Sequence, residues 1–308
     1  IELDGKEYKL LDKNFPTIDP KKPYALTKEE EDIMERLERA FENCEKLQRH
    51  MHFLLNKGGL YKVYNGNLLY HGCVPLKEDG NLKSVRIFGR AYKGKGLYEV
   101  LESYVRKGFY AMDPKEKERG KDIMWYIWLS ENSPLFGKDK MATFERYFLA
   151  EKETHKEKKN PYYLLLEDEK VVGKILKEFG LESEDAHIIN GHVPVKCKDG
   201  ENPVKCGGKV LVIDGGFSKA YQKETGIAGY TLIYNSYGLI LAAHKPFEST
   251  EAAIEKESDI HSDSTVVKRT LERKKVEDTD VGKELKEQIL DLEVLLAAYR
   301  SGVIAERM

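Results

Sequence analysis

Two apolar segments of this sequence end in the same local pattern, and this pattern constrains the fold more than any other feature. NLLYHGCVP, residues 67–75, runs up to His71, which glycine and then proline follow. IINGHVPV, residues 188–195, runs up to His192, with glycine just before it and proline two residues later. Glycine at a strand end leaves room beside the neighbouring side chain, and proline stops the strand. We therefore expect two strands that each present a histidine at a rigid end.

The pattern of apolar, polar and charged residues around these strands predicts an α/β core interrupted by a helical insertion. Residues 1–75 are expected to form part of the core, and residues 76–185 read as a charged, aromatic, helix-rich cap. Strand patterns return over 186–248, including KVLVIDGGF (residues 209–217), and 249–308 reads as a mostly polar helical tail.

Within the first range the local signals are strong. Thr27 and Glu30 form a capping box, and apolar residues then recur at helical spacing as far as Leu55, which predicts one helix of about seven turns. Asn65-Gly66 lies between two short apolar runs and predicts a hairpin turn.

Composition excludes several classes of protein. Of the 308 residues, 51 are basic and 53 acidic, so the net charge of -2 gives no bulk attraction to nucleic acid or membranes. No apolar run approaches the roughly 20 residues of a membrane span, and the charged first residues do not resemble a signal peptide. The four cysteines lack the spacing of a zinc site, so we expect a reducing cytoplasm.

The two histidines are candidate metal ligands. Adjacent strand ends would bring both imidazoles into one cleft, and imidazole binds manganese, iron and zinc well. The alternative for each is an ordinary packed or surface histidine. Asp214, at the end of KVLVIDGGF, is a candidate for the rim of the same site. Its alternative is a turn residue that accepts a hydrogen bond from its own backbone.

A cluster of cations marks a second candidate site. Lys138, Lys140 and Arg146 lie within NSPLFGKDKMATFERYF, a predicted loop-to-helix segment of the cap that is rich in aromatic residues. They are candidates for binding a phosphate group. The alternative is a solvated loop with ordinary surface cations.

These segments together resemble class III fructose-1,6-bisphosphatase, a family of the calcineurin-like metallophosphoesterases. The resemblance rests on LYHGCVPL, NSPLFGKDKMATFERYF, NGHVPVK, VIDGGFSKAYQKETGIAGYTLIYNS and DTDVGKELKEQILDL. It implies a metallophosphoesterase-type β-sandwich core flanked by helices. It also implies that this chain corresponds to the C-terminal half, because the G-D-x-H, G-D-x-x-D-R-G and G-N-H-E segments of the superfamily do not occur in it.

The resemblance further implies hydrolysis of fructose 1,6-bisphosphate to fructose 6-phosphate and phosphate, a reaction of gluconeogenesis. His71 and His192 would be two ligands of a centre with two divalent ions, most often manganese. The remaining ligands and any general acid would come from the N-terminal half of the same protein, and a homo-oligomer is a further possible partner state.

Two other functions stay open at this point. One is another phosphoesterase of the same fold, acting on phosphoproteins or dinucleotide polyphosphates. The other is a non-catalytic fragment or partner subunit, which the absent ligand segments favour. An apolar stripe in the predicted helix 283–302 would suit partner packing; its members are Leu285, Ile289, Leu292, Leu295 and Leu296.

Overall fold

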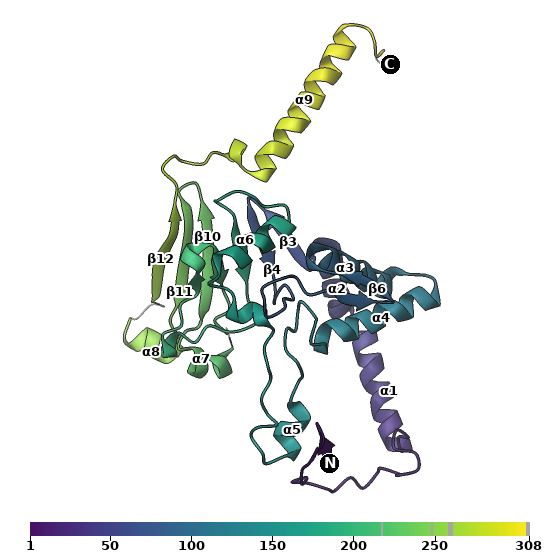
Figure 1. Cartoon of the computed structure of the whole chain (residues 1–308). Coiled ribbons are helices and arrows are strands. Elements are labelled where there is room, and N and C mark those ends of the chain that lie inside the picture. Colours follow the sequence, from purple (N-terminus) through teal and green to yellow (C-terminus); the bar gives the residue numbers. More distant parts are fainter. Residues whose placement is uncertain (217, 248, 258–260, 306–308) are drawn as a thin grey trace. The chain divides into compact units, whose positions relative to one another are not determined.

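The computed structural model describes residues 1–308 apart from 217, 248, 258–260 and 306–308 (Figure 1). Phe217, at the end of the predicted strand segment 209–217, lies outside the described residues. So do residues 248 and 258–260, and the last three residues of the predicted tail. The chain divides into two compact units. Unit 1 comprises residues 1–60, 75–77 and 82–161, and unit 2 comprises 61–74, 78–81 and 162–308.

The prediction of one long helix near the N-terminus is wrong, because two helices occupy this part of unit 1. Helix α1 spans Lys28–Glu42, and α2 spans Glu45–Lys57. At the break, Asn43 caps α1 by donating a side-chain hydrogen bond of 2.9 Å to the carbonyl of Arg39. Asparagine competes with the helix for backbone partners in this way, so it ends helices that the apolar spacing alone would continue. The predicted capping box of Thr27 and Glu30 is confirmed.

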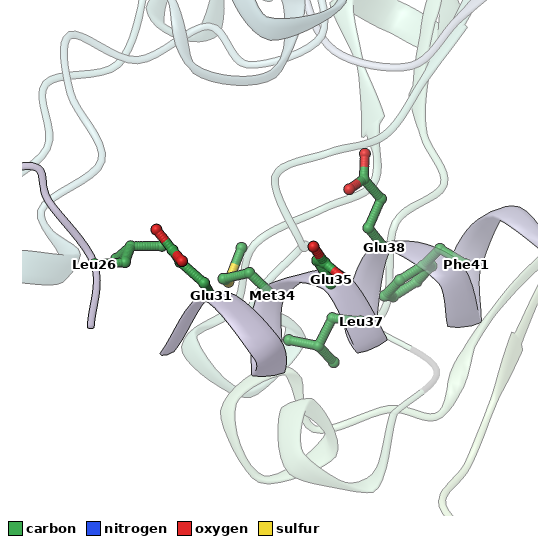
Figure 2. A pocket seen from close by; sticks show the side chains of 7 residues that line it. All are labelled: Leu26, Glu31, Met34, Glu35, Leu37, Glu38 and Phe41. Carbon is green, nitrogen blue, oxygen red and sulfur yellow. The ribbon is translucent and has the colours of Figure 1, made fainter. Parts of the chain in front are cut away.

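Helix α1 leaves its apolar face open to solvent. None of its residues is buried, and Met34, Leu37 and Phe41 expose 55%, 49% and 64% of their surface. Figure 2 shows these side chains lining a shallow pocket on the helix, together with Leu26 and three glutamates. An amphipathic helix usually buries such a stripe against another element.

Unit 1 has a small core between β5, α3 and α4, and it contains seven further elements besides α1 and α2 among the described residues. They are the strands β1 (Glu2–Leu3), β2 (Lys6–Glu7), β5 (Val85–Ile87) and β6 (Arg90–Tyr92), and the helices α3 (Gly94–Tyr110), α4 (Pro114–Leu129) and α5 (Thr143–Phe148). One buried cluster joins β5, α3 and α4 through Val85, Ile87, Leu97, Leu101, Ile123 and Ile127. Helices α3 and α4 come closest at Gly108 and Gly120, where a Cβ atom added to Gly120 would lie 2.3 Å from the Cα of Gly108.

Unit 2 contains a five-stranded sheet in the order β3-β4-β7-β9-β8. Its strands are β3 (Tyr61–Tyr64), β4 (Asn67–Tyr70), β7 (His187–Asn190), β8 (Val204–Lys205) and β9 (Val210–Val212). The predicted hairpin is confirmed: β3 and β4 pair antiparallel, and Asn65 and Gly66 take positive φ angles of 48° and 76°. Strands β4, β7 and β9 run parallel to one another.

The second sheet of unit 2 is antiparallel and follows the order β10-β11-β12. Strands β10 (Gly229–Asn235) and β11 (Gly238–His244) confirm two predicted strands. Strand β12 (Ser262–Arg269) corrects the prediction of a mostly helical tail. Its sequence SDSTVVKR contains three β-branched residues, which favour a strand, and it pairs with β11 along its length.

Side chains of both sheets meet in one cluster. Ile189 and Leu211 from the first sheet pack with Leu239 from the second, and Leu69, Leu232 and Val267 lie against them. The two sheets of unit 2 therefore share one apolar cluster. Unit 2 also has the helices α6 (Glu169–Glu178), α7 (Lys219–Thr225), α8 (Thr250–Glu255) and α9 (Asp280–Arg300), and the predicted mixed α/β class is confirmed.

Helix α9 coincides with the predicted helix 283–302, and its apolar stripe is largely exposed. The described residues between Ile1 and Ala305 contain no helix with the length and apolarity that a membrane span requires.

Candidate metal centre

The two candidate histidines and Asp214 follow three neighbouring parallel strands. His71 comes directly after β4, His192 comes two residues after β7, and Asp214 comes two residues after β9. The register aligns Leu69 of β4 with Ile189 of β7, and Ile189 with Leu211 of β9. Parallel strands in register end at the same edge of a sheet, and this geometry gathers the three polar side chains there.

Backbone hydrogen bonds hold these strand ends together. The N–H of Gly191 donates to the carbonyl of His71 at 2.8 Å, and the N–H of Val195 donates to the carbonyl of Asp214 at 2.8 Å. The buried side chain of Asn190 adds a third link by donating to the carbonyl of Gly72 at 3.0 Å. These hydrogen bonds link the backbone of the three strand ends that carry His71, His192 and Asp214.

The structure brings the two imidazoles into direct contact. Nε2 of His71 lies 3.0 Å from Nδ1 of His192, and the ring centroids are 4.9 Å apart at an interplanar angle of 70°. His192 has a φ of 69°, in the left-handed region that residues with a side chain rarely adopt. Such strain persists where the surrounding structure enforces it, and it concentrates at functional sites.

The electrostatics favour the neutral form of His71. Partial burial of the ring lowers the pKa of His71, because the imidazolium loses hydration, and the nearby Asp214 carboxylate opposes this shift without cancelling it. A neutral imidazole has a lone pair available for a metal, whereas the imidazolium does not.

Asp214 is a turn residue whose carboxylate lies near the histidine pair. Its Oδ1 accepts a hydrogen bond of 3.0 Å from the N–H of Gly216, as a turn aspartate does. A Cβ atom added to Gly191 would lie 3.8 Å from Oδ2 of Asp214, so the carboxylate lies beside the glycine that precedes His192. The carboxylate therefore borders the histidine pair while one of its oxygens holds the turn.

The pair fits part of a metal site. Two metal–nitrogen bonds of about 2.1 Å can bridge nitrogens that lie up to about 4.2 Å apart, and the observed separation of 3.0 Å is within this limit. No group of three or more His, Cys, Asp and Glu side chains among the described residues is arranged to hold a metal ion. The described part of the chain thus supplies two imidazoles and a neighbouring carboxylate, but not a complete ligand shell.

The three predicted cap cations lie in unit 1, and each has an acidic partner. Lys138 and Arg146 converge on Glu157, at 2.9 Å from Oε2 and 2.8 Å from Oε1, and Lys140 lies 3.3 Å from Glu145. The Glu157 side chain is only 11% exposed, whereas that of Arg146 is 53% exposed. The pKa of Glu157 is lowered overall: its burial opposes ionisation, but Lys138, Arg146 and the N–H of Ala142 outweigh that effect.

Sequence reasoning missed Glu157 and Asn190. Glu157 lies in the charged run EKETHKEKKN, where nothing distinguishes it from the neighbouring solvated residues. Asn190 lies inside an apolar run, and a lone asparagine at a predicted strand end was a signal that could have drawn attention to it.

Three other histidines, His52, His155 and His244, have ordinary structural surroundings. His52 packs edge-on against Phe109, with ring centroids 5.0 Å apart. His155 contacts the carbonyl of Leu149 at 3.0 Å, and His244 lies between the hydroxyl groups of Thr231 and Ser262. The four cysteines are all free thiols.

The two sheets, the imidazole pair and the adjoining carboxylate define a mixed α/β protein with a candidate metal site at the ends of parallel strands. The chain matches the family described as Firmicute fructose-1,6-bisphosphatase over residues 1–301, and it therefore belongs to that family.

Its curated relatives carry a consistent name. It is 57% identical over 310 residues to the class 3 fructose-1,6-bisphosphatase of Alkaliphilus metalliredigens, covering 100% of this chain and 47% of the relative. It is 56% identical over 308 residues to the enzyme of the same name from Clostridium novyi, covering 100% and 46%. The chain thus spans about half the length of the curated relatives it matches. No solved structure matches it.

Proposed function

We propose that this chain is part of a metal-dependent phosphatase that hydrolyses fructose 1,6-bisphosphate to fructose 6-phosphate and phosphate in the cytoplasm. The observation that carries the proposal is the pair of imidazoles at the ends of two parallel strands, with nitrogens 3.0 Å apart. Membership of the family supports the substrate, because the relatives that cover this whole chain are named for that reaction.

His71 and His192 are the proposed ligands to divalent metal, namely two manganese ions in a metallophosphoesterase-type core. When bound, such ions polarise a phosphoryl group and activate water. The chain's own contribution is to hold the imidazoles in place through Gly191 and Asn190 and to keep the His71 ring neutral by partial burial. Asp214 adds negative charge at the rim, which favours a cation in the site.

The cap cations are the proposed binding site for the phosphate that is not hydrolysed. A guanidinium has five N–H donors, and Arg146 uses one of them on Glu157. The other N–H donors of the exposed guanidinium can form a bidentate pair with phosphate oxygens. Glu157 would then hold Lys138 and Arg146 in one orientation before substrate arrives.

A second candidate has its own supporting observation. The described residues lack a three-ligand group, which favours a chain that is a subunit or fragment without activity by itself. In the proposed enzyme, the missing ligands and any general acid come from the part of the family's length that these 308 residues do not include.

Phosphate release tests the proposal. The chain is assayed with manganese, alone and together with a polypeptide corresponding to the rest of a relative's length. We expect the mixture to release phosphate from fructose 1,6-bisphosphate. His71→Ala or His192→Ala should lower the rate by at least about a hundredfold, since the loss of even an outer-shell partner costs 10–100-fold. His155→Ala, which removes an imidazole from another part of the chain, should leave the rate unchanged.

Other results would point elsewhere. Phosphate release from a phosphopeptide or a dinucleotide polyphosphate, without release from the sugar, would assign the chain to another phosphoesterase of the same superfamily. An unchanged rate in both histidine variants would refute the metal assignment.

A further inference from the structure

Helix α1 has an exposed apolar face with an acidic border. Met34, Leu37 and Phe41 follow one another at helical spacing on this face, and all three are about half exposed or more. Glu31, Glu35 and Glu38 line the same pocket (Figure 2). The whole helix carries seven acidic and three basic residues, a net charge of -4. A partner for this face must therefore be apolar at its centre and basic around it.

Helix α2, in the same unit, has a face of that description. Leu55 is the buried residue of α2, whereas Phe53 and Leu54 expose 64% and 59% of their surface. Arg49 and Lys57 lie four residues before and after Phe53, so both flank it on the helix surface. Lys46 continues the same stripe one turn further, and α2 carries a net charge of +2.

We propose that these two faces bind each other in a dimer of this chain, with α1 of each copy seated on α2 of the other. Two helices that follow each other in one chain, one acidic and one basic, form two identical contacts when a second copy is related by a two-fold axis. Phe53 of one copy would enter the pocket between Met34 and Phe41 of its partner, and the basic residues around Phe53 would face the glutamates.

The charges distinguish this arrangement from other helix pairings. Pairing α1 with α1 would place the three glutamates of one copy against those of the other, and like charges at an interface oppose association. Helix α9 carries five acidic and three basic residues, so it does not offer α1 a basic surface. Burial of Phe41 and Phe53 would supply most of the affinity, because aromatic anchors dominate interfaces, and the charges would set the pairing.

A charge-exchange experiment tests the proposal on the full chain. One variant carries Glu35→Lys with Glu38→Lys, and the other carries Lys46→Glu with Arg49→Glu. Sedimentation velocity over a concentration series measures the dimer dissociation constant. We expect a dimer for the unaltered chain and at least about tenfold weaker dimerisation for each variant. An equimolar mixture of the two variants should form a heterodimer, because both of its contacts then join opposite charges.

Circular dichroism establishes that each variant is folded, and Leu292→Ser on α9 serves as a control that should leave the dimer intact. A chain that stays monomeric at the highest concentration reached would overturn the proposal. So would variants that fail to associate when mixed although both are folded. Loss of the dimer in Leu292→Ser would assign the interface to α9 instead. None of these outcomes depends on the phosphatase assignment, since no substrate or metal enters the measurement.

Discussion

His187 begins β7 and lies almost completely inside unit 2, with 7% of its surface exposed. The pKa of His187 is lowered to about 4, chiefly because burial removes water from the imidazolium. The ammonium groups of Lys268 and Lys274 lower it further, and the carboxylate of Asp185 opposes them. Asp185 is itself paired with Lys268, so its charge is largely compensated. The native protein thus holds His187 neutral.

This titration predicts a loss of stability in acid. Below the usual histidine pKa of about 6.5 the unfolded chain binds a proton at His187, whereas the folded chain does so only near pH 4. The free energy of unfolding should therefore fall between about pH 6.5 and pH 4, by about 3 kcal/mol from this residue alone. Urea unfolding at several pH values measures it, and His187→Gln should show a correspondingly shallower decline. If the free energy of unfolding falls equally with decreasing pH in the two proteins, His187 is not the source of the acid sensitivity.

At the scale of elements, the contact of α3 with α4 depends on two glycines. Gly108 and Gly120 allow the helix backbones to approach so closely that no Cβ atom fits on Gly120. Gly173 in α6 differs, because a Cβ atom there would meet no atom within 4 Å. Gly120 and Gly173 both lie in the interior of a helix. Comparing alanine at the two positions therefore separates the effect of helix–helix contact from the effect of helix propensity.

We predict opposite outcomes for alanine at these positions. Gly120→Ala should destabilise the chain by about 3 kcal/mol, because overpacking forces α3 and α4 apart. Gly173→Ala should stabilise it by about 0.5–1 kcal/mol, since alanine favours the helix and nothing obstructs its methyl group. Chemical denaturation measures both. A Gly120→Ala protein as stable as the unaltered chain would mean that the helices separate at little cost.

Elements with a local signal could be predicted from the sequence. The β3–β4 hairpin follows from Asn65-Gly66, and the start of α1 follows from Thr27 and Glu30. The division between α1 and α2 could not be predicted, because the apolar spacing continues across Asn43, whereas its side chain caps the end of α1 and Cys44 takes an extended conformation. Strand β12 was missed because its side chains are mostly exposed, and its pairing with β11 supplies what its sequence does not signal.

At the scale of the whole molecule, the candidate site combines local and distant determinants. The repeated pattern around His71 and His192 predicted two strand ends, and parallel pairing of β4 with β7 places the two rings together. The ion cluster at Glu157 could not be predicted, because its partners are separated in sequence and it lies in a run of similar charges.

Arg146 provides a test of the proposed phosphate-binding site. In a preparation that hydrolyses fructose 1,6-bisphosphate, Arg146→Ala should raise KM at least about tenfold. The substitution removes the guanidinium that is proposed to pair with the phosphate that is not hydrolysed. Manganese affinity should stay unchanged, since the histidine pair is intact. Lys6→Ala, which removes an exposed cation paired with Glu153 in the same unit, is the matched control. Unchanged KM and kcat in Arg146→Ala would end the proposed role of the cap.

The parallel pairing of β4 with β7 also has a consequence for the order of folding. His71 and His192 come together only when the chain closes the loop from Tyr70 to His187, which includes α3 and α4. Closing a long loop costs entropy before any distant contact forms, so pairings of this kind are slow. The α3–α4 hairpin, whose contacts are local, should form first. We therefore expect the histidine pair to assemble late in folding, and a nascent chain would display its helices before it could acquire a metal.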